Sequence, residues 1–253
     1  MSLAEKRLFL LDMDGTIYLS ETLFDGTLDF LRYVRAIGGR YLFLTNNSSR
    51  GTDAYIAKMA RLGIEAFPDD FLTSAVAAIR YLRGRYLPDT VYYVCGTESL
   101  KNQLRLAGLR VAETLRDDCA VVLLGYDTEL TYEKIKTSAL LLLDKKVEFL
   151  ATHPDFVCPT DAGPLPDIGS FIRMYEAATG RSPQRIFGKP CTEVLEPVLS
   201  KYERKDVCMV GDRLMTDKVL GENAGIDFIL VLSGETTEAD LPKVHKQERI
   251  KAL

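Results

Sequence analysis

The chain has 253 residues, of which 47% are hydrophobic and 27% are charged, and its formal net charge is −4. A chain of this length forms one large domain or two modest ones, and its mild acidity argues against a nucleic acid polymer as a partner. It has no apolar run long enough to span a bilayer and no recognisable secretory leader, so we predict a cytoplasmic protein that does not associate with membranes.

The first part of the chain alternates between short apolar runs and segments with helical periodicity. Strands are predicted at 8–13 and 40–46, and helices at 28–38 and 52–62. Each helical segment ends at a glycine, Gly38 or Gly63, which is a common C-terminal stop signal. This alternation predicts a parallel sheet with helices on its faces, as in a doubly wound, Rossmann-like α/β fold.

The rest of the chain repeats the alternation. Further strands are predicted at 90–96, 119–125, 147–152, 206–212 and 227–234, and further helices at 98–107, 131–143, 170–179, 192–201 and about 216–224. An irregular loop rich in Pro and Asp is expected at 153–169. Breaks between domains are expected near 72–74 and near 182–185. An α/β fold is therefore predicted for the whole chain.

The cysteines and histidines exclude several kinds of site. The five cysteines form no C-x-x-C pair, which is typical of reduced thiols packed as small hydrophobic residues. The two histidines, His153 and His245, lie far apart in the sequence. A histidine-rich metal site is therefore nearly excluded, and a Ser-His-Asp triad is improbable.

Clusters of polar residues follow three of the predicted strands and the short apolar pair Ile186-Phe187, which we take as a fourth strand. They are Asp12 with Asp14, Thr45 with Asn46 and Asn47, Lys189, and Asp212 followed by Asp217. Ligands of open parallel sheets bind at the C-terminal ends of the strands, so we expect the four clusters to share one crevice. Neighbouring carboxylates repel each other, and a cation offsets that repulsion. Three carboxylates, from Asp12, Asp14 and Asp212, predict a Mg²⁺ site.

Two of these carboxylates suit the hydrolysis of a phosphate monoester. Asp12 would attack phosphorus and form an aspartyl-phosphate. Asp14 would protonate the leaving oxygen and then take a proton from the water that cleaves the intermediate. The sequence therefore predicts covalent catalysis by Asp12, with Asp14 as the general acid and base.

The remaining polar residues are predicted to bind the phosphate or to orient the site. Lys189 would stabilise negative charge on the transferred phosphoryl group. Thr45, Asn46 and Asn47 supply neutral groups for the phosphate oxygens. Asp217, near a predicted helix start, would orient the metal site without binding the ion directly.

Four motifs resemble those of the haloacid dehalogenase-like hydrolase superfamily, and they occur in the same order. They are DMDGT at 12–16, the Thr-Asn-Asn turn at 45–47, GKP at 188–190 and GDRLMTD at 211–217. In the phosphatases of that superfamily the first aspartate is the nucleophile, the second is the acid and base, and Mg²⁺ is the cofactor. The second aspartate also lends its backbone carbonyl to the metal. The resemblance covers nearly the whole chain.

The segment between the second and third motifs resembles the α/β cap of the para-nitrophenylphosphatase branch. The resemblance implies a core of 1–73 with 185–253 and an inserted cap of 74–184 that closes over the site. On the cap loop, Asp155 and Cys158 become candidate substrate contacts. His153 and Asp167 stand where the branch often has Asn and Gly, so the substrate stays open among sugar phosphates, nucleotides, phosphoglycolate and pyridoxal phosphate. Family members often pair through the cap, which implies a possible homodimer.

Simpler interpretations of these residues and rival functions remain. Paired aspartates and Thr-Asn-Asn are ordinary turn formers, Lys189 is of a type usually found on the surface, and Asp217 is an ordinary acid for a first helical turn. A phosphotransferase or mutase of the same superfamily has the same motifs. A dehalogenase would not need Asp14, and a non-catalytic binding protein would be expected to have lost a key residue. The prediction is a Mg²⁺-dependent phosphatase that acts on a small phosphorylated metabolite.

Overall fold

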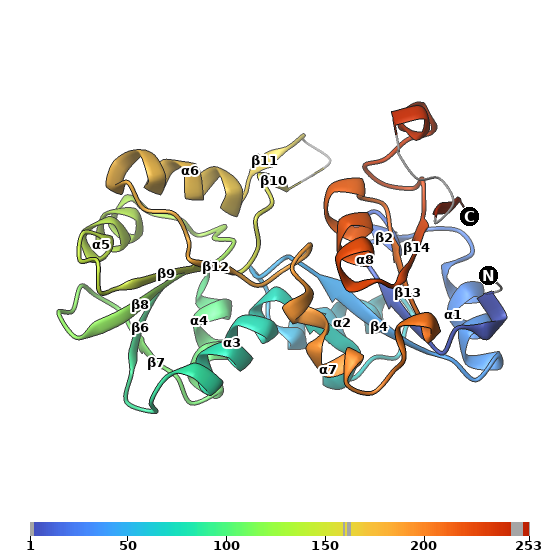
Figure 1. Cartoon of the computed structure of the whole chain (residues 1–253), viewed down its shortest axis with the longest axis horizontal. Coiled ribbons are helices and arrows are strands. Elements are labelled where there is room, and N and C mark those ends of the chain that lie inside the picture. Colours follow the sequence, from blue (N-terminus) through green and yellow to red (C-terminus); the bar gives the residue numbers. More distant parts are fainter. Residues whose placement is uncertain (1–2, 159, 161–162, 244–249, 253) are drawn as a thin grey trace. The chain divides into compact units, whose positions relative to one another are not determined.

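The computed structural model of the chain describes residues 3–158, 160, 163–243 and 250–252, and it divides into two compact units (Figure 1). The first unit comprises residues 1–45, 52–72 and 189–253. The second unit comprises residues 46–51 and 73–188. Two short segments, 46–51 and 185–188, and the single residue Thr73 thus belong to the second unit, whereas the sequence predicts them in the core.

The first unit is built on a six-stranded sheet in the order β15-β14-β13-β1-β4-β5. Its strands are β1 (Leu8–Leu11), β4 (Arg40–Thr45), β5 (Phe71–Thr73), β13 (Val207–Gly211), β14 (Asp227–Leu230) and β15 (Ile250–Ala252). The pairs from β15 through β4 are parallel. The C-terminal ends of β1 and β13 therefore lie side by side, and Leu11 pairs with Val210.

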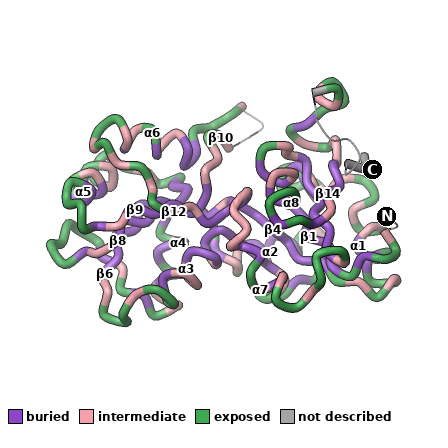
Figure 2. Tube along the Cα trace, viewed as in Figure 1, coloured by how far each residue is buried: buried purple, intermediate pink, exposed green. Residues whose placement is uncertain are grey.

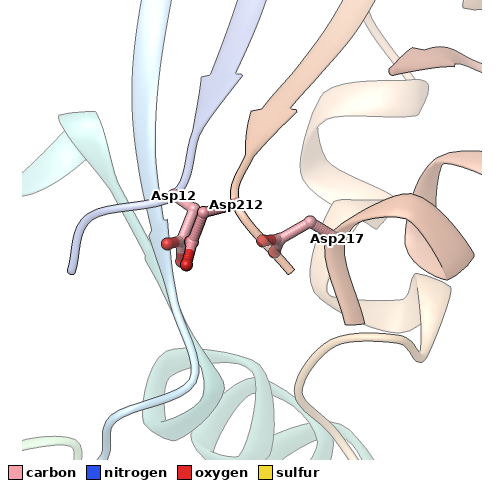
Figure 3. Close-up of side chains that lie close together, drawn as sticks. All are labelled: Asp12, Asp212 and Asp217. Carbon is pink, nitrogen blue, oxygen red and sulfur yellow. The ribbon is translucent and has the colours of Figure 1, made fainter. Parts of the chain in front are cut away.

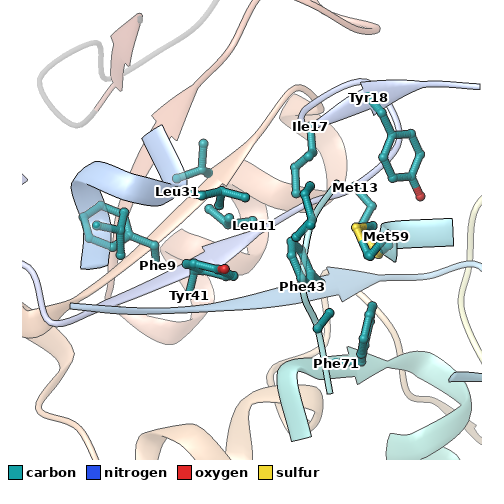
Figure 4. Close-up of a cluster of buried hydrophobic side chains, with 14 of the residues drawn as sticks. Phe9, Leu11, Met13, Ile17, Tyr18, Leu31, Tyr41, Phe43, Met59 and Phe71 are labelled. Atoms are coloured by element: carbon teal, nitrogen blue, oxygen red, sulfur yellow. The ribbon is translucent and has the colours of Figure 1, made fainter. Parts of the chain in front are cut away.

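The apolar sequence of β1 explains its central place in this sheet. All four of its residues are buried, as expected for a parallel strand that is covered on both faces. Figure 4 shows Phe9 and Leu11 within the cluster of buried side chains that fills this unit. Phe43 of β4 packs on Phe71, with ring centroids 5.3 Å apart. This core holds β1 in place and so fixes the residues that follow it.

The helices of the first unit are short. They are α1 (Thr27–Ala36), α2 (Thr52–Arg61), α7 (Glu196–Leu199) and α8 (Val219–Ala224). The helix predicted at 192–201 is instead a 3₁₀ turn, Thr192–Leu195, followed by α7. The helix predicted at 216–224 begins as a wide π-helical turn, Leu214–Lys218. A small hairpin, β2 (Tyr18–Leu19) and β3 (Thr22–Leu23), follows β1.

The second unit has its own parallel sheet, in the order β12-β9-β8-β6-β7. Its strands are β6 (Val91–Cys95), β7 (Arg110–Ala112), β8 (Cys119–Leu124), β9 (Glu148–Ala151) and β12 (Arg185–Ile186), with a separate hairpin of β10 (Val157–Cys158) and β11 (Leu165–Pro166). Its helices are α3 (Ser74–Arg85), α4 (Glu98–Leu106), α5 (Tyr132–Leu142) and α6 (Ile168–Thr179). The predicted α/β class with parallel sheets is confirmed for both units.

Threonine side chains begin three helices of the second unit. Thr73, Thr97 and Thr131 each accept a hydrogen bond from the backbone N–H three residues further on, at the start of α3, α4 and α5. The helix α3 was not predicted from the sequence, because the domain break was expected at its start. The strand β12 lies in the second sheet, beside β9, rather than in the sheet of the first unit.

The helices in both units are amphipathic. Figure 2 shows that the central strands of both sheets are buried, while helices such as α5 and α6 contain both buried and exposed residues. The longest helices, α3 and α6, have 12 residues each. In the described parts of the chain, no helix combines the length and the apolar character needed to cross a bilayer.

Candidate active site

Asp12 stands directly after β1, the buried central strand of the first unit. Its backbone N–H donates to the carbonyl of Val210, 2.9 Å away, so the strand pairing continues to Asp12. Asp212 stands directly after β13, the neighbouring strand. Both side chains are buried. The parallel pairing of β1 and β13 thus brings together two carboxylates that lie 200 residues apart in the sequence.

Asp217 completes an acidic cluster with Asp12 and Asp212. Each of the three offers a carboxylate oxygen that lies within 4.8 Å of the other two. Figure 3 shows the carboxylates of Asp12 and Asp212 next to each other, with Asp217 pointing toward them from the segment after β13. Oxygens at this spacing can converge on one small divalent cation with modest side-chain rotations. The wide turn Leu214–Lys218 is what returns Asp217 to the site.

Lys189 lies between two members of this cluster. Its ammonium donates a hydrogen bond to Oδ1 of Asp12, and it forms an ion pair of 2.7 Å with Oδ1 of Asp217. The side chain of Lys189 is buried. A buried ammonium is stable only when it is paired, and here two carboxylates pair with it. Lys189 is therefore part of the site rather than a surface lysine.

Burial and mutual repulsion perturb the charges in the cluster. Burial and, to a smaller extent, the charge of Asp12 raise the pKa of Asp212 to about 6, while the N–H of Glu235 opposes the shift. Burial also raises the pKa of Asp217, against the effect of Lys189. Burial alone would lower the pKa of Lys189, but Asp12 and Asp217 raise it above its usual value. The carboxylates of Asp212 and Asp217 are thus less stable as anions here than in water.

Glycines and a backbone amide enclose the carboxylate of Asp212. Gly15 has φ +89°, and a Cβ there would lie 2.6 Å from Oδ2 of Asp212. A Cβ at Gly234 would also collide with this carboxylate. The N–H of Glu235 donates to Oδ2 of Asp212 at 2.7 Å. Glycine is therefore needed at both positions so that the backbone can approach the acid closely.

Thr16 is a residue of the site to which we assigned no role from the sequence. Its hydroxyl lies 3.3 Å from Oδ2 of Asp12 and 3.2 Å from Oδ1 of Asp212. One hydroxyl proton can serve only one of these oxygens at a time, so Thr16 bridges the two acids. The signal was present in the sequence, because Thr16 belongs to DMDGT, four residues after Asp12.

Asp14 stands apart from the acidic cluster. Its side chain is 53% exposed, and a carboxylate oxygen lies 3.9 Å from Nζ of Lys58. The hydroxyl of Tyr18 lies 3.5 Å from the other oxygen, and Nζ of Lys58 lies over the Tyr18 ring. Partial burial among these groups raises the pKa of Asp14, and the charge of Lys58 opposes the shift. A carboxyl that is accessible and holds its proton more tightly than usual suits an acid and base.

The Thr-Asn-Asn turn is divided between the two units. Thr45 ends β4 in the first unit and is buried, whereas Asn46 and Asn47 belong to the second unit. The carbonyl of Asn46 accepts a hydrogen bond of 2.5 Å from the hydroxyl of Ser74. Oδ1 of Asn47 accepts from both the N–H and the hydroxyl of Ser49, at 2.9 and 2.7 Å. Asn47 therefore forms a local turn with its own side chain.

The candidate substrate contacts of the cap loop also lie in the second unit. The amide of Asn46 donates to both carboxylate oxygens of Asp155, at 3.2 and 3.1 Å. Cys158 lies in β10, half-buried, near Tyr126, whose pKa is raised by burial and by this contact. The structure therefore brings Asp155 to Asn46, while Cys158 has a different neighbour.

Comparison with known proteins identifies the family. A family model described as haloacid dehalogenase-like hydrolase matches residues 9–110, and one described as HAD-hydrolase-like matches residues 186–252. An acid sugar phosphatase from Staphylococcus haemolyticus is 35% identical over 94% of this chain and 90% of its own length. The two matched segments carry every residue of the acidic cluster, and Lys189 as well.

Solved structures agree in both fold and sequence. A 4-nitrophenylphosphatase from Thermotoga maritima has a TM-score of 0.93 and 39% identity, covering 99% of this chain and 95% of that one. A glycerol phosphate phosphatase from Mycobacterium tuberculosis, solved in complex with magnesium, has a TM-score of 0.89 and 30% identity, covering 99% of this chain and 77% of that one. The chain belongs to the haloacid dehalogenase-like hydrolase superfamily, in the branch of the para-nitrophenylphosphatases.

Proposed function

We propose that this protein hydrolyses small phosphate monoesters with the help of Mg²⁺, through an aspartyl-phosphate on Asp12. One observation carries the proposal: Asp12, Asp212 and Asp217 form a buried acidic cluster, and Lys189 pairs with two of its members. That the protein is a phosphatase follows from its relatives, which are named as phosphatases and match nearly the whole chain. The cofactor and the covalent mechanism are the further steps proposed here.

The charge of the cluster supports a divalent cation. Three carboxylates and the single ammonium of Lys189 leave a net charge of about −2 in a buried site when all are ionised. Such a charge is costly in a buried site, which is why the pKa of Asp212 is raised. A divalent cation would neutralise it, and the all-oxygen donor set fits Mg²⁺. Asp12 and Asp212 would hold the ion, with Asp217 and the backbone carbonyl of Asp14 as the other candidate ligands.

The chemical step divides between Asp12 and Asp14. An oxygen of Asp12 attacks phosphorus, the bond from phosphorus to the ester oxygen breaks, and the proton of Asp14 passes to the leaving oxygen. Asp14, now a carboxylate, takes a proton from water, and the resulting hydroxide attacks phosphorus and releases Asp12 and inorganic phosphate. The exposed position of Asp14 and its raised pKa suit both transfers.

The cation and Lys189 supply electrostatic stabilisation. When bound, Mg²⁺ would act as a Lewis acid on the phosphoryl oxygens. The ammonium of Lys189 reduces the repulsion between the anionic Asp12 and an incoming phosphate dianion, because it already contacts the Asp12 carboxylate. Thr45, Asn46 and Asn47 are proposed to donate to the remaining phosphate oxygens, and the second unit is proposed to be the cap, in which Asp155 and Cys158 contact the rest of the substrate.

The substrate class is a small phosphorylated metabolite. The relatives are named for sugar phosphates, glycerol phosphate and 4-nitrophenyl phosphate, all of them small esters. Among sugar phosphates, nucleotides, phosphoglycolate and pyridoxal phosphate, we propose sugar and polyol phosphates as the first to test. The cytoplasmic location and the possible homodimer remain predictions from the sequence.

A panel of phosphate monoesters tests the proposal directly. The release of inorganic phosphate would be measured for each ester with Mg²⁺, with EDTA, and after Mg²⁺ is restored. We expect turnover that EDTA abolishes and Mg²⁺ restores, with the highest kcat/KM on a small ester. Turnover unaffected by EDTA would refute the role of the cation, and transfer of the phosphoryl group to a second sugar would indicate a mutase.

A further inference from the structure

A buried histidine in the second unit lies between two carboxylates. His153 follows β9, and its side chain is only 1% exposed. Nδ1 lies 3.6 Å from Oδ2 of Asp155, and Nε2 lies 3.6 Å from Oδ1 of Asp167. Neither ring nitrogen has a hydrogen-bond partner within the described residues. A polar ring buried in this way requires an explanation, because an unsatisfied buried nitrogen is costly.

The geometry favours the doubly protonated ring. A neutral imidazole carries one N–H, so one of its nitrogens would present a lone pair to a carboxylate. In the imidazolium both nitrogens are donors, and each then faces an acceptor after a shift of about half an ångström toward ordinary hydrogen-bond distance. Asp155 and Asp167 lie on opposite sides of the ring, which matches two donors rather than one.

Asp167 is held in place by the start of α6. It is the N-cap of that helix, and its Oδ1 accepts a hydrogen bond of 2.6 Å from the N–H of Ile168. The helix N-terminus favours a negative charge at this position. Gly169 lies against the backbone before β10, since a Cβ there would be 2.5 Å from the carbonyl of Pro154. The Asp167 side of the arrangement therefore has a rigid support.

Asp155 connects His153 to the Thr-Asn-Asn turn. Its carboxylate accepts from the side-chain amide of Asn46 with both oxygens, at 3.2 and 3.1 Å. Its backbone carbonyl accepts from the N–H of Gly169 at 2.7 Å. A continuous series of contacts thus runs from Asp167, the N-cap residue of α6, through His153 and Asp155 to Asn46. All of these residues belong to the second unit.

We propose that His153 is a positioning residue: as an imidazolium between Asp155 and Asp167, it fixes Asp155 and, through it, the side-chain amide of Asn46. The inference rests on the proposed function, because Asn46 is a predicted phosphate contact. His153 is proposed neither as a ligand of the cation nor as a group that acts on the reacting atoms. Its role is to orient Asn46.

The charge state of His153 is testable in the wild-type protein. The chain has only two histidines, so a long-range ¹H–¹⁵N spectrum at pH 7.5 contains two imidazole spin systems, and His153→Asn identifies that of His153. We expect both ring nitrogens of His153 to show the shifts of protonated nitrogens. A neutral ring with one protonated and one bare nitrogen would overturn the proposal.

The positioning role is tested with inorganic phosphate as the probe, in the presence of Mg²⁺. His153→Leu should raise the phosphate Kd about ten-fold or more, the loss expected when a charge-assisted contact is removed. It should raise KM for an ester more than it lowers kcat, and leave the Mg²⁺ requirement unchanged. In an Asp155→Asn background the same substitution should have a much smaller effect, because both act through Asn46.

A matched control separates positioning from general damage to the second unit. Tyr86 donates a 2.6 Å hydrogen bond to Glu148 at the opposite end of β9, so Tyr86→Phe removes a comparable contact away from Asn46. It should leave the phosphate Kd unchanged. A folded His153→Leu variant with wild-type phosphate affinity, or equal effects in both backgrounds, would refute the proposal. Failure of the wild type itself to bind phosphate would instead refute the proposed function.

Discussion

The ammonium of Lys189 lies 2.7 Å from a carboxylate oxygen of Asp217, and both side chains are buried. The same ammonium contacts Asp12, the proposed nucleophile. Lys189 is thus the one cation among the residues that make up this cluster. When all four side chains are ionised, the three carboxylates and this ammonium have a net charge of about −2. This negative charge favours the binding of a further cation. We therefore expect Mg²⁺ to stabilise the folded protein as well as to support its activity.

Replacing Lys189 should damage both stability and catalysis. Lys189→Met leaves Asp12 and Asp217 without their shared cation, and breaking a buried pair of this kind costs about 3–5 kcal/mol. We expect a lower melting temperature that added Mg²⁺ partly restores, and a kcat/KM lower by about 100-fold or more. Thermal melts and phosphate release measure both. Lys205→Met, which removes an exposed lysine paired with Glu203, is the control and should change neither.

Asp217 should control the affinity for the cation. Asp217→Asn keeps the size of the side chain but removes a charge from the cluster, so the Mg²⁺ concentration at half-maximal activity should rise about 10- to 100-fold. Asp53→Asn, at an exposed position in the first turn of α2, is the matched control. An Asp217 variant with the wild-type Mg²⁺ requirement would exclude this residue from the metal site.

The raised pKa of Asp212 predicts that the metal-free protein becomes less stable as the pH rises. The folded protein binds a proton at Asp212 up to a pKa of about 6, whereas the unfolded chain releases it near 3.8. The folded state thus holds the extra proton between these values, and the contribution of Asp212 to the free energy of unfolding falls as the pH rises from about 4 to 7. Above that window the full penalty of the buried charge remains.

Mg²⁺ should remove this penalty, since it replaces the proton. In melts with EDTA or Mg²⁺, the gain in melting temperature from Mg²⁺ should be larger at pH 7.5 than at pH 5 by about 3 °C or more. Asp212→Asn has no carboxylate to titrate, so it isolates the contribution of this residue. If Mg²⁺ raised the melting temperature equally at both pH values, that result would contradict the idea that Mg²⁺ replaces the proton of Asp212.

Thr16 should support the two carboxylates that it bridges. Thr16→Val keeps the shape of the side chain and removes the hydroxyl that reaches Asp12 and Asp212, so kcat/KM should fall about ten-fold. Thr16→Ser keeps the hydroxyl and should retain most of the activity. If the valine and serine variants behave alike, the packing of Thr16 matters rather than its hydrogen bonds.

Much of the fold could be predicted because its strands are continuous apolar runs. β1 and β13 were expected from LFLL and VCMVG, and the rule that parallel strands end at a common edge predicted that Asp12 and Asp212 would meet. The helix α3 was missed because it follows β5 with no intervening turn, at the place where a domain break was expected. Its buried residues are mainly small, so its apolar face is weakly marked.

Other features depend on geometry that the sequence does not encode locally. Asp217 joins the acidic cluster through the wide turn after Arg213, which a spacing of five residues does not specify. Asn46 belongs to the second unit, where it forms hydrogen bonds with Ser74 and Asp155, both distant in the chain. The neighbours of His153 likewise come from separate segments. These long-range contacts need the tertiary fold.

The most direct test of the account is to look for a phosphoryl group on Asp12. Wild-type enzyme mixed with substrate and Mg²⁺, quenched in acid within milliseconds and digested, should yield a phosphorylated peptide from the end of β1. The modification should be absent with EDTA and absent in Asp12→Asn, which should retain no measurable turnover. Full turnover by Asp12→Asn, or a phosphoryl group trapped on a different residue, would contradict the account.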